Sequence, residues 1–171
     1  VENQTRKLFK VCVMRNIPIF TFINKMDREA RDPFDLLDEI ETELGIKTYP
    51  VNWPIGSGKE FKGVYEREKR RIISFEANNG TREVAATDAS LADLIGEHNY
   101  EKLSEDVELL DGASEEFNMD LVSKGKLSPV FFGSALTNFG VEPFLEHFLK
   151  MTTSPLPRST PDGIVDPFDP E

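Results

Sequence analysis

Apolar and polar residues alternate near the start of the chain with the periods of a helix, a strand and a second helix. Residues 2–15 carry apolar side chains at helical spacing among basic ones, which predicts an amphipathic helix. Residues 17–23 form a nearly continuous run of β-branched and aromatic side chains, typical of a strand buried on both faces. Asp32 and Pro33 then provide an N-cap and a first helical residue, so we expect a helix that ends at Gly45.

The pattern changes between residues 49 and 124. Short β-branched and aromatic segments over residues 49–84, with a turn at residues 78–80, predict antiparallel strands joined as hairpins. Residues 88–124 return to helical spacing with a strong excess of acidic residues. We interpret the whole stretch as an insertion, an α+β subdomain with a small core of its own.

The first pattern resumes after the insertion. Residues 128–133 predict a second buried strand, and residues 141–150 predict an amphipathic helix. The tail is rich in Pro and Asp, which is typical of a linker toward a following domain. We therefore divide the chain into residues 1–48 and 128–153 as one α/β unit, 49–127 as the insertion and 154–171 as the linker.

The composition and net charge of the chain exclude several classes of protein. The chain has 171 residues, of which 39% are hydrophobic and 30% charged, so a packed core is expected. Its 20 Lys and Arg against 31 Asp and Glu give a net charge of −11, which argues against nonspecific binding to DNA or RNA. No apolar run approaches the roughly 20 residues that cross a bilayer, so we expect a cytoplasmic protein without membrane contact.

Few residues point to metal or redox chemistry. The single Cys12 excludes an internal disulfide and a Cys-rich metal site. His98 and His147 lack a partner at ligand spacing, so positions at the surface or on a helix face are favoured over metal or catalytic roles. The basic run at residues 69–71 is expected on an exposed strand edge.

Distinctive polar groups follow both predicted buried strands. Open α/β sheets bind ligands beyond the carboxyl ends of their strands, where loops converge. The first strand is followed by residues 24–27, Asn-Lys-Met-Asp, and the second by residues 133–136, Gly-Ser-Ala-Leu. We expect these loops to form a guanine site whose nucleotide-binding residues are Asn24, Lys25, Asp27, Ser134, Ala135 and Leu136.

Asp27 carries the base specificity in this hypothesis. A carboxylate can accept hydrogen bonds from the adjacent N1–H and 2-amino groups, which guanine has and adenine lacks. Each such bond contributes about 1.5–3 kcal/mol, so the discrimination between the two bases is large. Asn24 either braces the neighbouring loops or reaches the purine edge, the Lys25 stem covers one face of the ring, and the Ala135 N–H donates to the 6-oxo group.

Short motifs of this kind are also compatible with other structures. An isolated Asn-Lys-x-Asp can form a helix-capping turn, but the second motif, after a matching strand, favours the guanine site. Residues 56–59, Gly-Ser-Gly-Lys, resemble the end of a phosphate loop, yet Trp53 stands where the first Gly is needed and Glu60 where Ser or Thr must hold magnesium. We therefore expect no phosphate binding there.

The two strand-end motifs carry a family resemblance that covers most of the chain. Residues 24–28 and 133–136 resemble the fourth and fifth signature motifs of translational GTPases. Residues 49–56 resemble the start of the insertion that elongation factor G and its relatives carry inside their G domain. The longer stretches 24–33 and 128–141 are most similar to the branch of this family that acts in translation termination.

The resemblance implies an α/β fold, the C-terminal half of a P-loop GTPase with a Rossmann-like sheet interrupted by the insertion. It implies a ribosome-associated GTPase that binds GTP or GDP and promotes the departure of class I release factors from the ribosome. The phosphate loop and the magnesium switches lie upstream of the base motif in this family. The sequence starts at Val1, after the expected place of these motifs, so we assign no catalytic or metal-binding residue. We expect Mg²⁺ only together with the upstream motifs, and no GTP hydrolysis by these residues alone.

Two alternatives stay open. The chain could come from another translational GTPase, either one like elongation factor G or a ribosomal protection protein. It could instead be a non-enzymatic module in which the insertion binds a protein partner and the strand-end motifs are structural.

Overall fold

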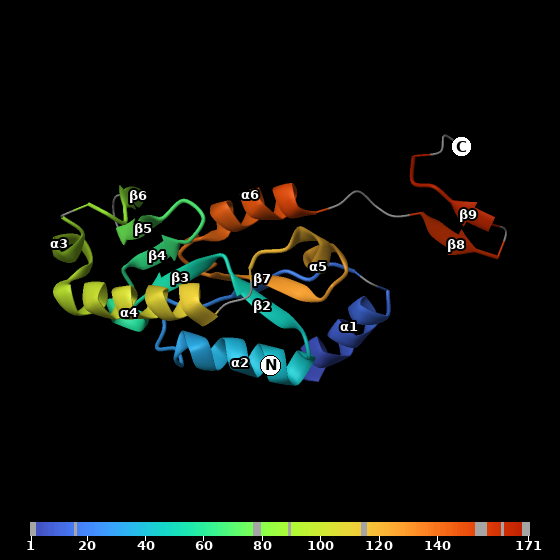
Figure 1. Ribbon diagram of the computed structural model, residues 1–171, viewed down its shortest axis with the longest axis horizontal. Helices are drawn as coiled ribbons and strands as arrows, with labels where there is room; N and C mark the ends of the chain where they lie inside the picture. The colour runs from blue at the N-terminus through green and yellow to red at the C-terminus, as the bar shows by residue number, and fades with distance from the viewer. Residues whose placement is uncertain are drawn as a thin grey trace.

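The computed structural model describes residues 3–15, 17–76, 80–88, 90–113, 116–152, 157–161 and 163–168. Two sheets lie next to each other, with helices along both faces of the parallel one, and a terminal hairpin projects away from the rest (Figure 1). The helix α6 covers one face of the parallel sheet, whereas α1 and α2 lie on the opposite face (Figure 1). The arrangement is a mixed α/β fold.

The helices are α1 (Asn3–Met14), α2 (Pro33–Leu44), α3 (Leu91–Ile95), α4 (Glu97–Ala113), α5 (Met119–Ser123) and α6 (Val141–Met151), with a short 3-10 turn, η1 (Gly58–Glu60). The strands are β1 (Thr21–Ile23), β2 (Lys47–Pro50), β3 (Asn52–Ile55), β4 (Gly63–Glu66), β5 (Arg71–Glu76), β6 (Gly80–Ala85), β7 (Leu127–Phe132), β8 (Arg158–Thr160) and β9 (Gly163–Val165).

The parallel sheet has three strands in the order β1-β7-β2. The central strand β7 is buried at all six positions, as its apolar sequence predicted. It pairs with β2 through its first half, from Leu127, and with β1 through its second half, up to Phe132. Strand β2 was not predicted, and residues 49 and 50, assigned to the antiparallel region, belong to it. A four-residue strand ending in Pro is too short to give a clear periodic signal.

Strand β1 is shorter and less buried than predicted. Only Thr21–Ile23 pair with β7, and all three residues are half-buried. By the register of the pair, Pro18 and Phe20 lie opposite Leu127 and Pro129. Pro18 and Pro129 have no N–H for a ladder bond, so the pairing is confined to the end of the run. The expectation of a strand over residues 17–23 buried on both faces was therefore wrong.

Helix α2 forms as its sequence predicted. The Asp32 side chain caps it by accepting from the Phe34 N–H at 2.9 Å, and Pro33 is its first residue. Gly45 ends the helix with a φ of +66°, in the left-handed region that glycine tolerates best.

The antiparallel sheet has four strands in the order β3-β4-β5-β6. Its consecutive hairpins confirm the predicted antiparallel strands, and α3, α4 and α5 confirm the helical region that follows. Glu76 pairs with Gly80 at the β5–β6 connection. Of the turn predicted at residues 78–80, residues 78 and 79 lie outside the described residues.

The apolar core is continuous across both sheets. Trp53 on β3 is fully buried, and its ring lies 4.6 Å from that of Phe34 on α2 and 5.5 Å from that of Phe132 on β7. Its Nε1–H donates to Oδ2 of Asp106 on α4 at 2.9 Å. A single side chain therefore connects the antiparallel sheet with both the parallel sheet and two helices.

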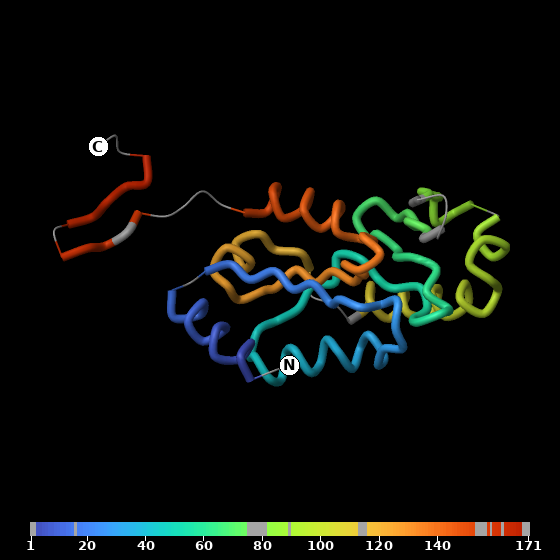
Figure 2. Tube along the Cα trace, turned by 180° about the vertical axis from the view of Figure 1, so that it is seen from behind, coloured from blue at the N-terminus to red at the C-terminus, as the bar shows by residue number. Residues whose placement is uncertain are grey.

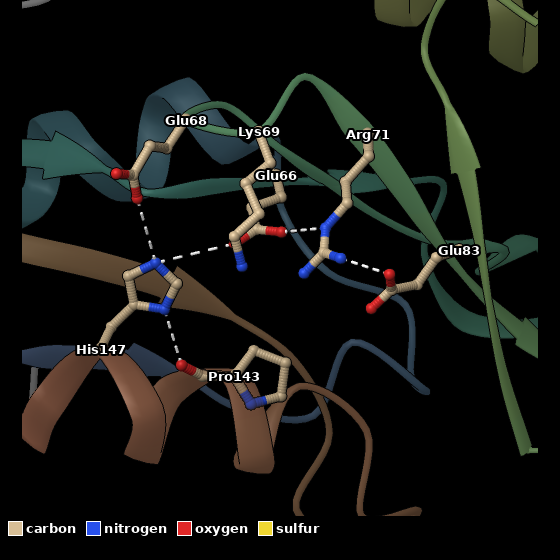
Figure 3. Close-up of polar contacts among 7 residues, drawn as sticks. All are labelled: Glu66, Glu68, Lys69, Arg71, Glu83, Pro143 and His147. Atoms are coloured by element: carbon tan, nitrogen blue, oxygen red, sulfur yellow. Dashed lines mark hydrogen bonds and ion pairs between the residues drawn. The ribbon is translucent and has the colours of Figure 1, made fainter.

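His147 is buried rather than at the surface, with only 4% exposed. Its Nδ1 donates to the carbonyl oxygen of Pro143 at 2.7 Å, since a carbonyl can only accept. Its Nε2 lies 3.7 Å from Oε1 of Glu66 and 3.6 Å from Oε2 of Glu68 (Figure 3). The contact joins α6 to the antiparallel sheet, and no local pattern indicated it because its partners lie on a distant hairpin.

Glu66 is the buried centre of this charged cluster. It is 2% exposed, its Oε2 accepts from Nε of Arg71 at 2.5 Å, and its Oε1 lies 3.2 Å from Nζ of Lys69 (Figure 3). Burial alone would raise the pKa of Glu66, but the hydrogen bond from Arg71 and the positive charges of Arg71 and Lys69 bring this pKa below its usual value. Arg71 also pairs with Glu83 on β6 and begins a strand that is paired on both sides. The prediction that residues 69–71 form an exposed strand edge was wrong: Lys69 and Arg70 are exposed but lie in the turn between β4 and β5, and Arg71 begins β5.

The end of the described chain forms a small hairpin. Residues 154–171 were predicted as a linker, and β8 and β9 pair there with Arg158 opposite Val165. The hairpin projects away from the rest of the molecule in both views (Figures 1 and 2). Residues 154–156, 162 and 169–171 of this region lie outside the described residues. Across the described ranges, no helix is both long and apolar enough to span a bilayer.

Candidate guanine-recognition site

The two predicted site loops meet at one edge of the parallel sheet. β1 and β7 are parallel neighbours, so the loops that follow them leave from the same end (Figure 2). The Gly133 N–H donates to the Ile23 carbonyl, and the Met26 N–H donates to the Gly133 carbonyl, each at 3.1 Å. Backbone hydrogen bonds thus continue from the strands into the loops.

Side chains then connect the loops directly. Oδ1 of Asn24 accepts from the Ala135 N–H at 2.8 Å and from the Lys25 N–H at 2.7 Å. Oδ1 of Asp27 accepts from the Ser134 hydroxyl at 2.5 Å. Of the two roles considered for Asn24, the structure shows the bracing of the neighbouring loop.

Asp27 is placed to accept further hydrogen bonds. It is half-buried, and its second oxygen, Oδ2, has no hydrogen-bond partner within the described ranges. Ser134 beneath it is fully buried and fixes the first oxygen. A carboxylate with one oxygen fixed and the other available suits a pair of adjacent N–H donors. The Ala135 N–H already donates to Asn24, so a 6-oxo group would share this donor or replace Asn24 as its acceptor.

The remaining predicted residues border the site. Lys25 is exposed and has a φ of +72°, a strained conformation for a residue with a side chain. Ala135 and Leu136 are exposed in the second loop, Leu136 by 79%. An aliphatic Lys stem and an exposed Leu are suitable surfaces for a planar base.

The second loop has a tightly closed backbone. The Ser134 N–H donates to the Phe139 carbonyl at 3.0 Å, and the Phe139 N–H returns a bond to the Ser134 carbonyl at 2.9 Å. At Gly133, a Cβ atom would lie 2.6 Å from the Phe139 carbonyl oxygen and 2.8 Å from the Phe22 ring. Only glycine fits between the strand end and the loop.

The site loops and the parallel sheet match a known protein family. The family described as elongation factor Tu GTP binding domain matches residues 1–154. The chain belongs to this family. The matched residues include both the parallel sheet and the site loops.

Relatives within this GTP-binding domain family share about half of their residues with the chain. It is 52% identical to peptide chain release factor 3 of Trichormus variabilis, over 100% of this chain and 33% of that protein. It is 49% identical to peptide chain release factor 3 of Symbiobacterium thermophilum, over 99% of this chain and 33% of that protein. The chain therefore spans about a third of the length of these relatives.

A solved structure shows the same fold. The crystal structure of a protein from Thermus thermophilus superposes with a TM-score of 0.63 over 90% of this chain and 25% of that one. The two sequences are 22% identical in the aligned part, so the likeness concerns the fold alone.

Sequence reasoning missed the residues that support the site loops from outside. The segment 56–59, set aside as a phosphate-loop decoy, contacts the first site loop: the Gly58 N–H donates to the carbonyls of Met26 and Arg28. On β3, the buried Asn52 side chain bonds both backbone groups of Phe132, next to Gly133. A polar residue between the apolar Val51 and Trp53 was the one signal that could have indicated it.

Proposed function

We propose that the chain is the guanine-recognition part of a ribosome-associated GTPase that acts in translation termination and promotes the release of class I release factors from the ribosome. The observation that carries the guanine part is the linkage of the two strand-end loops through Asn24 with Ala135 and Asp27 with Ser134. The termination role rests on the similarity, at about half of the residues, to proteins named peptide chain release factor 3.

Base recognition in this proposal depends on Asp27. The N1–H and 2-amino groups of guanine donate to its carboxylate, whereas adenine would place a lone pair against it. Two hydrogen bonds to a charged acceptor are together worth about 3–6 kcal/mol, which decides the choice between the bases. Ser134 holds the carboxylate, the Lys25 stem and Leu136 flank the ring, and Ala135 offers its N–H to the 6-oxo group.

Hydrolysis needs groups that we assign to other segments of a longer protein. Phosphoryl transfer depends on a phosphate-binding loop, Mg²⁺ and a residue that orients the attacking water. We assign none of these roles to the residues of this chain. Its contribution is to bind and orient the base of GTP or GDP, which places the phosphates for the remaining machinery.

The path of the chain supports the proposed insertion. The chain leaves the parallel sheet at the end of β2 and returns to it at β7, the strand that pairs with β2. The antiparallel sheet and α3 to α5 lie between these two strands in the sequence and add no strand to the parallel sheet. Because β2 ends at Pro50 and β7 begins at Leu127, we propose residues 51–126 as an inserted subdomain and residues 1–50 and 127–153 as parts of one G domain.

The test uses the full-length protein. We expect tight binding of GDP, weak binding of ADP, and GTP-dependent departure of a class I release factor from ribosomes after peptide release. Guanine selectivity without any effect on release-factor departure would contradict the termination role and favour another step of translation. Equal affinity for GDP and ADP would contradict the guanine site itself.

A further inference from the structure

We propose that the connection between β3 and β4 (residues 56–62) positions both guanine-recognition loops, and that Gly58 is its main positioning residue. The proposal rests on the proposed guanine site. It adds a role in nucleotide recognition to a segment outside the two sequence motifs.

Gly58 contacts the first loop on both sides of Asp27. Its N–H donates to the Met26 carbonyl at 2.9 Å and to the Arg28 carbonyl at 3.0 Å. These are the residues directly before and after Asp27 in the sequence. A single donor therefore fixes the backbone that carries the base-reading carboxylate.

The position requires glycine for two reasons. Gly58 has a φ of +59°, which a residue with a Cβ rarely adopts. A Cβ atom would also lie 3.1 Å from the Glu29 backbone nitrogen and 3.4 Å from the Arg28 carbonyl carbon. Any side chain here would push against the loop that holds Asp27.

The same connection reaches the second loop through an aromatic contact. The rings of Phe61 and Phe139 lie 5.4 Å apart at 85°, and both residues are buried. Phe139 closes the second loop by its paired backbone bonds with Ser134, the residue whose hydroxyl holds Asp27. Gly58 and Phe61 thus act on Asp27 from two directions.

Loss of this support should weaken recognition of the base more than binding of the phosphates. If Asp27 is displaced, its bonds to the N1–H and 2-amino groups weaken, while contacts made elsewhere to the phosphates are unchanged. The ratio of the affinities for GDP and IDP, which lacks the 2-amino group, reports this loss. A general loss of folding would lower both affinities and leave the ratio unchanged.

The experiment compares Gly58→Ala with Gly45→Ala in the full-length protein. Gly45 has a similar φ of +66°, but a Cβ there meets nothing within 4 Å, so it matches the backbone strain without touching the site. We expect Gly58→Ala to reduce the GDP/IDP affinity ratio about fivefold or more. This corresponds to a loss of about 1 kcal/mol in the binding free energy of the 2-amino group, caused by the displaced loop. Gly45→Ala should keep the wild-type ratio.

The outcomes separate this proposal from the proposed function. A wild-type protein with no preference for GDP over IDP would overturn the guanine site itself. A wild-type preference that Gly58→Ala retains as fully as Gly45→Ala would overturn the positioning role alone. If Gly58→Ala does not fold, Phe61→Leu decides: a reduced ratio supports the proposal and an unchanged ratio overturns it.

Discussion

The parallel and antiparallel sheets differ in what covers their strands and in what their loops do. In the parallel sheet only the central β7 is buried throughout, and β1 is half-buried along its length. In the antiparallel sheet β3 and β4 are buried at every position. The less covered sheet nevertheless carries the candidate site, because parallel neighbours bring two loops to one edge.

The site loops follow strands of the parallel sheet, but they depend on residues of the antiparallel region. Trp53, Asn52 and Gly58 all come from the antiparallel region, and each contacts the parallel sheet or its loops. The antiparallel sheet therefore acts as a support for the site, and it shares one apolar core with the parallel sheet. Substitutions at different points of this support should weaken it to different degrees.

Removing the aromatic connection should have the largest effect on stability. Trp53→Ala deletes a fully buried ring that packs on Phe34 and Phe132, so we expect a loss of about 3–5 kcal/mol in the free energy of unfolding. Denaturant titration of the full-length protein measures it. Trp53→Phe keeps the ring contacts and loses the hydrogen bond to Asp106, so it should cost clearly less. Equal costs for the two variants would contradict the packing role.

Removing the hydrogen bonds between Asn52 and the Phe132 backbone should have an intermediate effect on stability, confined to the neighbourhood of Phe132. Asn52→Ala leaves the buried N–H and carbonyl of Phe132 without their side-chain partner. We expect a loss of about 1–3 kcal/mol in the free energy of unfolding. Hydrogen exchange should show the loss at the Phe132 amide, by about tenfold or more. Ser74→Ala, at a buried position in the antiparallel sheet, serves as the control and should leave this amide protected. Unchanged protection in Asn52→Ala would show that the sheets do not depend on this bond.

Substitution of Glu66, the buried carboxylate beside α6, should have the smallest effect on the free energy of unfolding, and this effect should depend on pH. The pKa of Glu66 lies below its usual value of 4.5, so its contacts stabilise the fold above about that pH and are lost as pH falls through the folded-state pKa. Glu66→Gln replaces a charged acceptor by a neutral one, at about 1 kcal/mol near neutral pH and less in acid.

Asp106 serves as a control, because its pKa is shifted in the opposite direction to that of Glu66. Burial raises the pKa of Asp106 despite its bond from Trp53, so its contribution is lost as pH rises. Unfolding free energies of the wild type, Glu66→Gln and Asp106→Asn from pH 3 to 7 measure both slopes. A Glu66→Gln difference that does not grow with pH would contradict the assigned role of this cluster.

The parts of the fold that were predicted depend on neighbours in sequence. Helix α2 follows from Asp32, Pro33 and Gly45, which all act within one turn of its ends. The site loops were predicted because each polar motif directly follows a strong apolar strand signal, and the structure brings the loops together.

The parts that were missed depend on distant partners. Strand β2 exists because β7 offers it a parallel edge, and His147 is buried because Glu66 and Glu68 lie opposite α6. Gly58 was recognised as a glycine in a phosphate-loop decoy, but its contact with Met26 and Arg28 needs the folded hairpin. Periodicity and local propensity contain no information about such contacts.

The base-reading role of Asp27 is the central claim, and a change of base specificity tests it most directly. Asp27→Asn in the full-length protein replaces one acceptor oxygen by an amide donor, which suits the 2-oxo group of xanthine. We predict that GDP affinity falls by about 100-fold or more while XDP binding improves, as expected for the loss of two charged hydrogen bonds. Unchanged GDP affinity and no gain for XDP would contradict the account.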